Sequence, residues 1–129
     1  MKAVDTNVVV RYVTNDDPVQ SPIATVVLGE PCYVSDTVLL ETARLLSSHY
    51  GFGRGLLAET LADLIQLPTV TVSDRAWIAW AIERFARGAD LADMIHLVNA
   101  RHMDAFISFE KQLGRLAGPE TPLPVERPS

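Results

Sequence analysis

A short apolar run that starts almost at the first residue and ends abruptly in Asp5-Thr6-Asn7 constrains this chain more than any other feature. A second apolar run, Val8-Val9-Val10, follows at once. This pattern predicts a buried strand whose carboxyl end delivers Asp5, with a helix starting directly after it. In open α/β sheets, ligands bind outside the carboxyl ends of the strands. Asp5 is therefore a candidate for chemistry; the alternative is that it only caps the helix, a position that Asp, Thr and Asn favour.

The rest of the chain alternates between strand and helix patterns. Further strands are predicted at residues 32–34, 69–72 and 105–109, from short runs rich in β-branched and aromatic residues. Apolar spacing, capping residues and prolines predict helices at residues 8–14, 19–28, 37–49, 54–66, about 75–87, 90–102 and 110–117. This alternation predicts an α/β fold with a mostly parallel central sheet and helices on both of its faces.

Length and composition restrict the function classes. A chain of 129 residues suggests one domain with a substantial core. The net charge of −5 argues against a passive nucleic-acid coat, which would more often be basic. It does not argue against a metal-dependent nuclease, whose acidic site attracts phosphate once cations fill it. The single cysteine, Cys32, and the absence of an export signal lead us to expect a cytoplasmic protein without a membrane segment.

Acidic residues recur in apolar surroundings further along the chain. Glu41 lies within an apolar helix, where the alternative is an ion pair with Arg44 one turn on. Asp90 and Asp93 are three residues apart on one helical face, where the alternative is favourable placement at a helix N-terminus. Glu110 follows the last predicted central strand much as Asp5 follows the first, and the alternative is a first-turn helix acid.

Taken together, these acids indicate a shared site, which none of them indicates alone. Two come from strand ends, and the others come from helices that could pack around those ends. Carboxylates that converge repel one another and raise each other's pKa, so folding alone would not favour such a cluster. Mg²⁺ and Mn²⁺ do favour it, because both prefer oxygen ligands. The pattern therefore predicts a site for divalent cations, where a metal-bound water can become the nucleophile for phosphodiester cleavage.

Four groups of residues carry a family resemblance, in this order: Ala3-Val4-Asp5-Thr6-Asn7, Leu40-Glu41, Ala89-Asp90-Leu91-Ala92-Asp93-Met94-Ile95-His96 with Ala100, and Ile107-Ser108-Phe109-Glu110-Lys111. With them the chain resembles the PIN domain, and in particular the VapC-type toxins of bacterial toxin–antitoxin pairs. The resemblance covers residues 1–117. Residues 118–129 are expected to form a proline-rich tail with one edge strand near residues 123–125.

The resemblance implies a three-layer α/β/α sandwich and a ribonuclease that depends on Mg²⁺ or Mn²⁺. It also implies 5′-phosphate and 3′-hydroxyl products, a homodimer and a partner antitoxin. Carried over by motif position, the acidic core is Asp5, Glu41 and Asp93, the accessory acid is Asp90, and the supporting polar residues are Thr6, Asn7 and Ser108. Candidate RNA contacts are Arg11 and Arg44.

The fourth acid departs from the family pattern, because Glu110 stands where aspartate is usual. Its longer side chain is expected to reach a metal directly or through water, but the change could instead weaken a second metal site. The alternative function is therefore a PIN-fold module that binds RNA or a protein without cutting.

Overall fold

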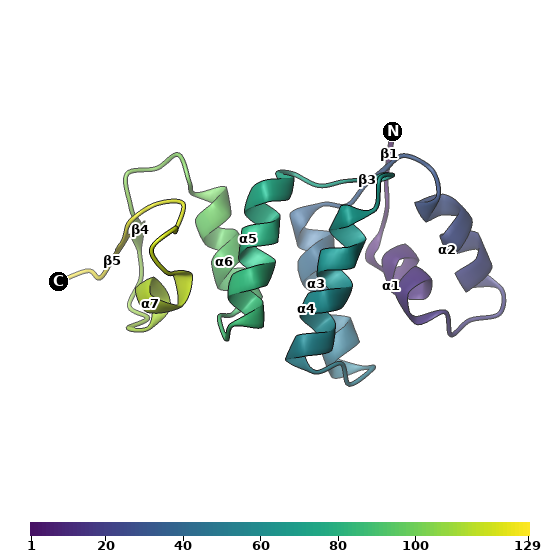
Figure 1. Ribbon diagram of the computed structural model, residues 1–129, viewed down its shortest axis with the longest axis horizontal. Helices are drawn as coiled ribbons and strands as arrows, with labels where there is room; N and C mark the ends of the chain where they lie inside the picture. The colour runs from purple at the N-terminus through teal and green to yellow at the C-terminus, as the bar shows by residue number, and fades with distance from the viewer. The chain divides into compact units, whose positions relative to one another are not determined.

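The computed structural model describes residues 1–129, with seven helices and five short strands (Figure 1). The contacts between residues divide the chain into two compact units, Met1–Arg75 and Ala76–Ser129. Each unit contains strands that pair in parallel. The α/β class and the parallel pairing predicted from the sequence are therefore confirmed.

The first unit is built on a three-stranded parallel sheet. Its strands are β1 (Lys2–Ala3), β2 (Cys32–Tyr33) and β3 (Val70–Thr71), in the order β1-β2-β3. Ladder hydrogen bonds continue past the strand ends, from the amide of Val4 to the carbonyl of Tyr33 at 3.0 Å and from Val34 to Thr71 at 2.9 Å. All three strands run in the same direction, so their carboxyl ends share one edge of the sheet.

Four helices complete this unit: α1 (Thr6–Thr14), α2 (Gln20–Leu28), α3 (Asp36–Ser48) and α4 (Arg54–Gln66). α1 packs against α2 and α3, α3 packs against α4, and α4 contacts β3. α3 begins at Ser35, whose hydroxyl accepts the amide of Val38 at 3.2 Å, as an N-cap should. The core contains fully buried side chains from the sheet and helices, among them Val9, Val34, Leu39, Leu46, Leu61 and Ile65.

The second unit contains α5 (Arg75–Ala86, starting at the unit boundary), α6 (Leu91–Asn99), β4 (Phe106–Ile107), α7 (Leu113–Ala117) and β5 (Val125–Glu126). β4 and β5 pair in parallel, and α7 contacts β5. The turn between α5 and α6 passes through Gly88 at φ +120°, where a side chain would be strained. This turn leads directly into Asp90, the N-cap of α6.

Several element boundaries differ from the sequence prediction. The ladders contain two residues per strand, which is shorter than predicted. The last helix begins at Leu113 rather than at residue 110, because a turn held by the hydroxyl of Ser108 and the carbonyl of Glu110 comes first. The edge strand of the tail lies at Val125–Glu126 rather than at residues 123–125. No helix is both long enough and apolar enough to cross a membrane.

Candidate active site

Asp5 lies where the sequence predicts it, just beyond the carboxyl end of β1. It is also the N-cap of α1: one carboxylate oxygen accepts the amide of Thr6 at 2.8 Å. The Asp5 side chain is exposed, and its second oxygen accepts no hydrogen bond from the protein. The capping alternative is thus present in the structure, and it leaves one oxygen of Asp5 available to a ligand.

The two polar residues after Asp5 have different surroundings. Thr6 is 3% exposed and lies at the start of α1. Asn7 is exposed and lines a cavity of about 200 Å³ between α1 and α2, together with Arg11 and Ile23. Both residues stay within one helical turn of Asp5, as a supporting role requires, and that role remains a prediction.

Glu41 lies on the exposed face of α3. Its carboxylate is 3.9 Å from the guanidinium of Arg44, and both side chains are more than half exposed. The i,i+3 ion pair considered in the sequence is therefore formed, although such an exposed pair contributes little to stability. Because the pair is weak, a metal cation can replace Arg44 as the partner of the Glu41 carboxylate.

Asp90 and Asp93 share the first turn of α6. Asp90 is the N-cap, and its carboxylate accepts the backbone amide of Asp93 at 3.0 Å. Only the main chain of Asp93 takes part in this bond, so its carboxylate is not used for capping. Asp90 therefore stabilises the turn that carries Asp93, which is compatible with the accessory role predicted for it.

The pKa of the Asp93 carboxyl is raised, first by burial and then by the negative charges of Asp90 and Glu110. The ring of His96 acts in the opposite direction and lowers it. None of these three carboxylates forms an ion pair with a lysine or arginine. The net effect on the Asp93 carboxyl is a raised pKa, as mutual repulsion between carboxylates produces, and the role of the three acids in a metal site remains a prediction.

Glu110 does not lie in a helix. Its amide donates to the hydroxyl of Ser108 at 3.0 Å, and its carboxylate oxygen is 3.5 Å from the amide of Gln112. Ser108 in turn donates its own amide to the carbonyl of Glu126 at 3.0 Å, beside the β4–β5 ladder. The position of Glu110 is therefore fixed by a turn whose first residue is held by the sheet.

The predicted acids are divided between the two compact units. Asp5 and Glu41 belong to Met1–Arg75, and Asp90, Asp93 and Glu110 belong to Ala76–Ser129. Neither unit by itself gathers three His, Cys, Asp or Glu side chains closely enough to hold a metal ion. The electrostatic effects on Asp93 act over longer distances than metal–ligand bonds, so the convergence of all the acids remains a prediction.

The donor chemistry of these residues nevertheless fits a hard divalent cation. Every candidate ligand is a carboxylate, and oxygen ligands are those that Mg²⁺ and Mn²⁺ prefer. The negative charges of Asp90 and Glu110, which raise the pKa of the Asp93 carboxyl, are what a cation would neutralise. Cys32, by contrast, is buried, and burial raises the pKa of its thiol, so it contributes nothing to such a site.

Arg11, a candidate RNA contact, is engaged in a side-chain network. Its guanidinium donates to Gln20 at 3.0 Å, to Asp16 at 3.3 Å and to Tyr50 at 3.2 Å. The Tyr50 hydroxyl donates to Asp16 at 2.8 Å, and hydrogen bonds from Thr14 and Tyr50 lower the pKa of the Asp16 carboxyl. This network gives Arg11 a structural role; an additional RNA contact stays a prediction.

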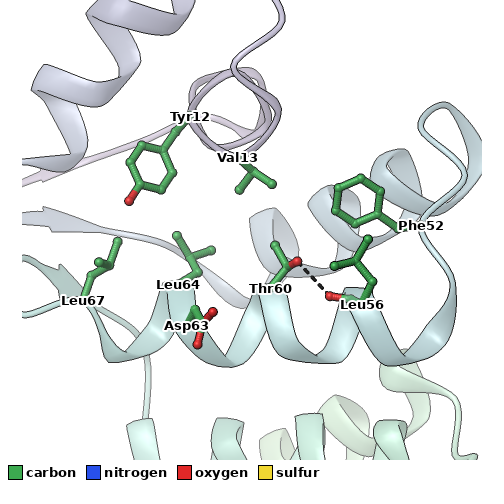
Figure 2. A pocket seen from close by; sticks show the side chains of 8 residues that line it. All are labelled: Tyr12, Val13, Phe52, Leu56, Thr60, Asp63, Leu64 and Leu67. Carbon is green, nitrogen blue, oxygen red and sulfur yellow. Dashed lines mark hydrogen bonds between the residues drawn. The ribbon is translucent and has the colours of Figure 1, made fainter.

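A second cavity in the first unit, of about 430 Å³, is lined mostly by apolar side chains. Figure 2 shows Tyr12 and Val13 of α1 on one side of it, and Leu56, Thr60 and Leu64 of α4 on the other. Leu56 is 53% exposed although it is large and apolar. None of the predicted acids lines this cavity, so it is not part of the candidate active site.

Two basic residues to which the sequence pattern assigns no role lie beside Glu110. Lys111 and Arg127 line a pocket of about 200 Å³ together with Ser108 and Glu110. The position of Lys111 directly after Glu110 was a signal that could have identified it. Arg127 gave no such signal, since only the pairing of β5 with β4 brings it here.

The parallel strands, with Asp5 just beyond the carboxyl end of β1, form an α/β fold of the kind that binds ligands at this edge of the sheet. The sequence matches the PIN domain family over residues 2–119, and the chain belongs to that family. The PIN-like fold predicted from the sequence is thus confirmed, and PIN domains are usually nucleases that use divalent metal ions. No curated protein matches the chain.

Replacing Asp93 with Asn is expected to leave the metal-free protein at least as stable as the wild type at pH 7. Because its pKa is raised, Asp93 lowers stability as the pH rises through that pKa and the carboxyl becomes charged. The difference between the two proteins should therefore shrink toward about pH 4, near the pKa of an unperturbed Asp. Urea unfolding of both proteins at pH 7 and at about pH 4 measures this difference in stability. A loss above about 2 kcal/mol at pH 7 would indicate a broken structural interaction instead.

Proposed function

We propose that this protein is an endoribonuclease that depends on Mg²⁺ or Mn²⁺ and cleaves RNA to 5′-phosphate and 3′-hydroxyl ends. The proposed catalytic and metal-binding residues are Asp5, Glu41, Asp93 and Glu110, with Asp90 as the accessory acid. The domain that carries this activity comprises residues 1–117, and residues 118–129 form its tail.

One observation carries this proposal beyond family membership. Burial and the negative charges of Asp90 and Glu110 raise the pKa of the Asp93 carboxyl, and no basic side chain forms an ion pair with any of the three. A fold selected only for stability would gain from removing one of these charges. The presence of these acids in a chain of the PIN domain family supports a role in holding a cation.

A divalent ion bound by these carboxylates supplies Lewis-acid stabilisation of the charge that develops on the transferring phosphate. The protein's own residues position that ion and the RNA. Asp90 fixes the first turn of α6 and so orients Asp93. The Ser108 hydroxyl fixes the turn that carries Glu110, and Thr6 holds Asp5 through its amide.

We further propose that the protein is the cytoplasmic toxin of a VapC-type pair, forms a homodimer and is inhibited by a cognate antitoxin. Large apolar side chains at the surface support a protein partner: on α2, Ile23 is 60% exposed and Val26 is 66% exposed. A small open reading frame directly upstream that encodes a binding partner would support this role. Co-expressing the two chains and testing for co-purification examines it directly.

The function is tested by a cleavage assay on the full-length protein stripped of metal. Structured RNAs, including tRNAs, are incubated with and without Mn²⁺, and the ends of the products are mapped. Discrete cuts that require the metal are expected, and Glu110→Gln is expected to slow them if the longer fourth acid takes part. RNA binding without any cleavage, under every metal condition, would favour the non-cutting PIN module.

Added Mg²⁺ or Mn²⁺ is expected to raise the melting temperature of the wild type more than that of Asp93→Asn. A ligand that binds only the folded state adds about 2.7 kcal/mol of stability at a concentration 100 times its Kd. Thermal unfolding followed by circular dichroism measures the shift, with KCl at the same ionic strength as the control. Equal shifts for the two proteins would remove Asp93 from the metal site.

A further inference from the structure

We propose that the pocket lined by Ser108, Glu110, Lys111, Gly114, Glu126 and Arg127 binds a phosphate of the RNA backbone next to the phosphate that is cut, through Lys111 and Arg127. This inference rests on the proposed function, since it assigns a substrate subsite to the same acidic site. Lys111 ends the fourth motif of the family resemblance, but the resemblance assigns it no role, and Arg127 lies outside the motifs.

The two cations are positioned by different elements that meet at this pocket. Lys111 follows Glu110 in the turn held by the Ser108 hydroxyl. Arg127 follows Glu126, whose carbonyl accepts the amide of Ser108 at 3.0 Å. Ser108 is therefore the common anchor, and both basic residues are adjacent in sequence to residues bonded to it.

Both cations remain without a carboxylate partner although acids are nearby. Glu110 and Glu126 line the same pocket, yet neither Lys111 nor Arg127 takes part in an ion pair or hydrogen bond. Two other exposed arginines do pair: Arg44 with Glu41, and Arg87 with Glu83 at 3.4 Å. Donors that stay unpaired beside a pocket are available to a ligand with acceptor oxygens.

The charge balance of the protein favours such a subsite for an RNA substrate. The chain has a net charge of −5, and the candidate site concentrates further negative charge around Asp93. An RNA strand entering this region would be repelled unless cations neutralise its phosphates locally. Lysine binds a phosphate as a point charge and arginine binds it with a planar fork, so this pair suits a phosphodiester.

The test measures RNA binding separately from cleavage. Fluorescence anisotropy with a labelled single-stranded RNA, in EDTA, compares the full-length wild type with Lys111→Ala, Arg127→Ala and Lys111→Arg. Each alanine variant is expected to weaken binding about fivefold, the size of a partly exposed charge interaction. The dependence of log Kd on log salt should lose about 0.7 in slope per phosphate contact removed. Lys111→Arg should keep both the affinity and the slope.

Matched controls are Lys2→Ala, which removes the chain's only other lysine, and Arg87→Ala, which removes an exposed arginine elsewhere. Both are expected to bind RNA as the wild type does. The weakening at Lys111 and Arg127 should be equal for poly-U and poly-A, because phosphate contacts carry no base specificity. A loss confined to one sequence would contradict a backbone contact.

The outcomes separate this inference from the proposed function. If the alanine variants bind RNA as the wild type does, or if the wild type binds no RNA, the phosphate subsite is wrong. If the wild type binds RNA through Lys111 and Arg127 but never cuts it, the subsite stands and the nuclease proposal fails. Inorganic phosphate that competes as well as RNA at equal phosphate concentration would identify free phosphate as the ligand and would also overturn the proposal.

Discussion

Asp5→Asn is expected to lower the rate of RNA cleavage by at least about 100-fold, the effect typical of removing one group that stabilises transition-state charge. Asp5 lies past the carboxyl end of β1, where one of its oxygens accepts the Thr6 amide and the other is available. Asparagine caps a helix about as well as aspartate, so the start of α1 should be retained. The substitution therefore removes the negative charge while preserving the local fold. Single-turnover cleavage with saturating Mn²⁺ measures the effect.

Asp17→Asn provides a matched control for this change. Asp17 is also a capping carboxylate: it accepts the amides of Val19 at 2.9 Å and Gln20 at 2.7 Å at the start of α2. It lies outside the family motifs, so its replacement should leave the cleavage rate unchanged. Equal rates for Asp5→Asn and wild type, with circular dichroism spectra that match, would exclude Asp5 from catalysis. Equal losses in both variants would indicate a capping effect.

Leu28→Ala is expected to reduce the free energy of unfolding by about 2–5 kcal/mol, the range for truncating a buried leucine. Leu28 ends α2 and is 2% exposed. Its carbonyl accepts the hydroxyl of Thr69 at 2.6 Å, and the carbonyl of Thr69 accepts the amide of Cys32 at 2.9 Å. A cavity at Leu28 therefore forms where α2 meets the β2–β3 ladder. Urea unfolding followed by circular dichroism measures the loss.

Leu56→Ala is the corresponding control, since it removes the same atoms from a side chain that is 53% exposed. A surface change of this kind is expected to alter stability by less than about 0.5 kcal/mol. Similar losses in the two variants would mean that Leu28 is less well packed than its burial indicates. A loss confined to Leu28→Ala would confirm that burial, rather than residue type, sets the cost.

The local sequence pattern was sufficient to predict the order of the elements. The strand-to-helix junction at Asp5 was predicted because an apolar run, a capping residue and a second apolar run identify it without long-range contacts. Ser35 and Asp90 are caps for the same reason. The predicted start of the last helix, at residue 110, is three residues too early. The hydroxyl of Ser108 accepts the amide of Glu110 in a turn that competes with the helix.

The sequence by itself determined the α/β class, the family and the candidate acids, because helix and strand periodicity, caps and motif spacing are local properties. Tertiary structure alone decided which charges act on one another. The pKa of the Asp93 carboxyl depends on its burial and on Glu110, which is distant in sequence from α6. Arg127 reaches the Ser108 pocket only through the parallel pairing of β5 with β4. Both effects join segments that are distant in sequence. Their energies therefore depend on the tertiary contacts of the folded chain rather than on the residues adjacent in sequence.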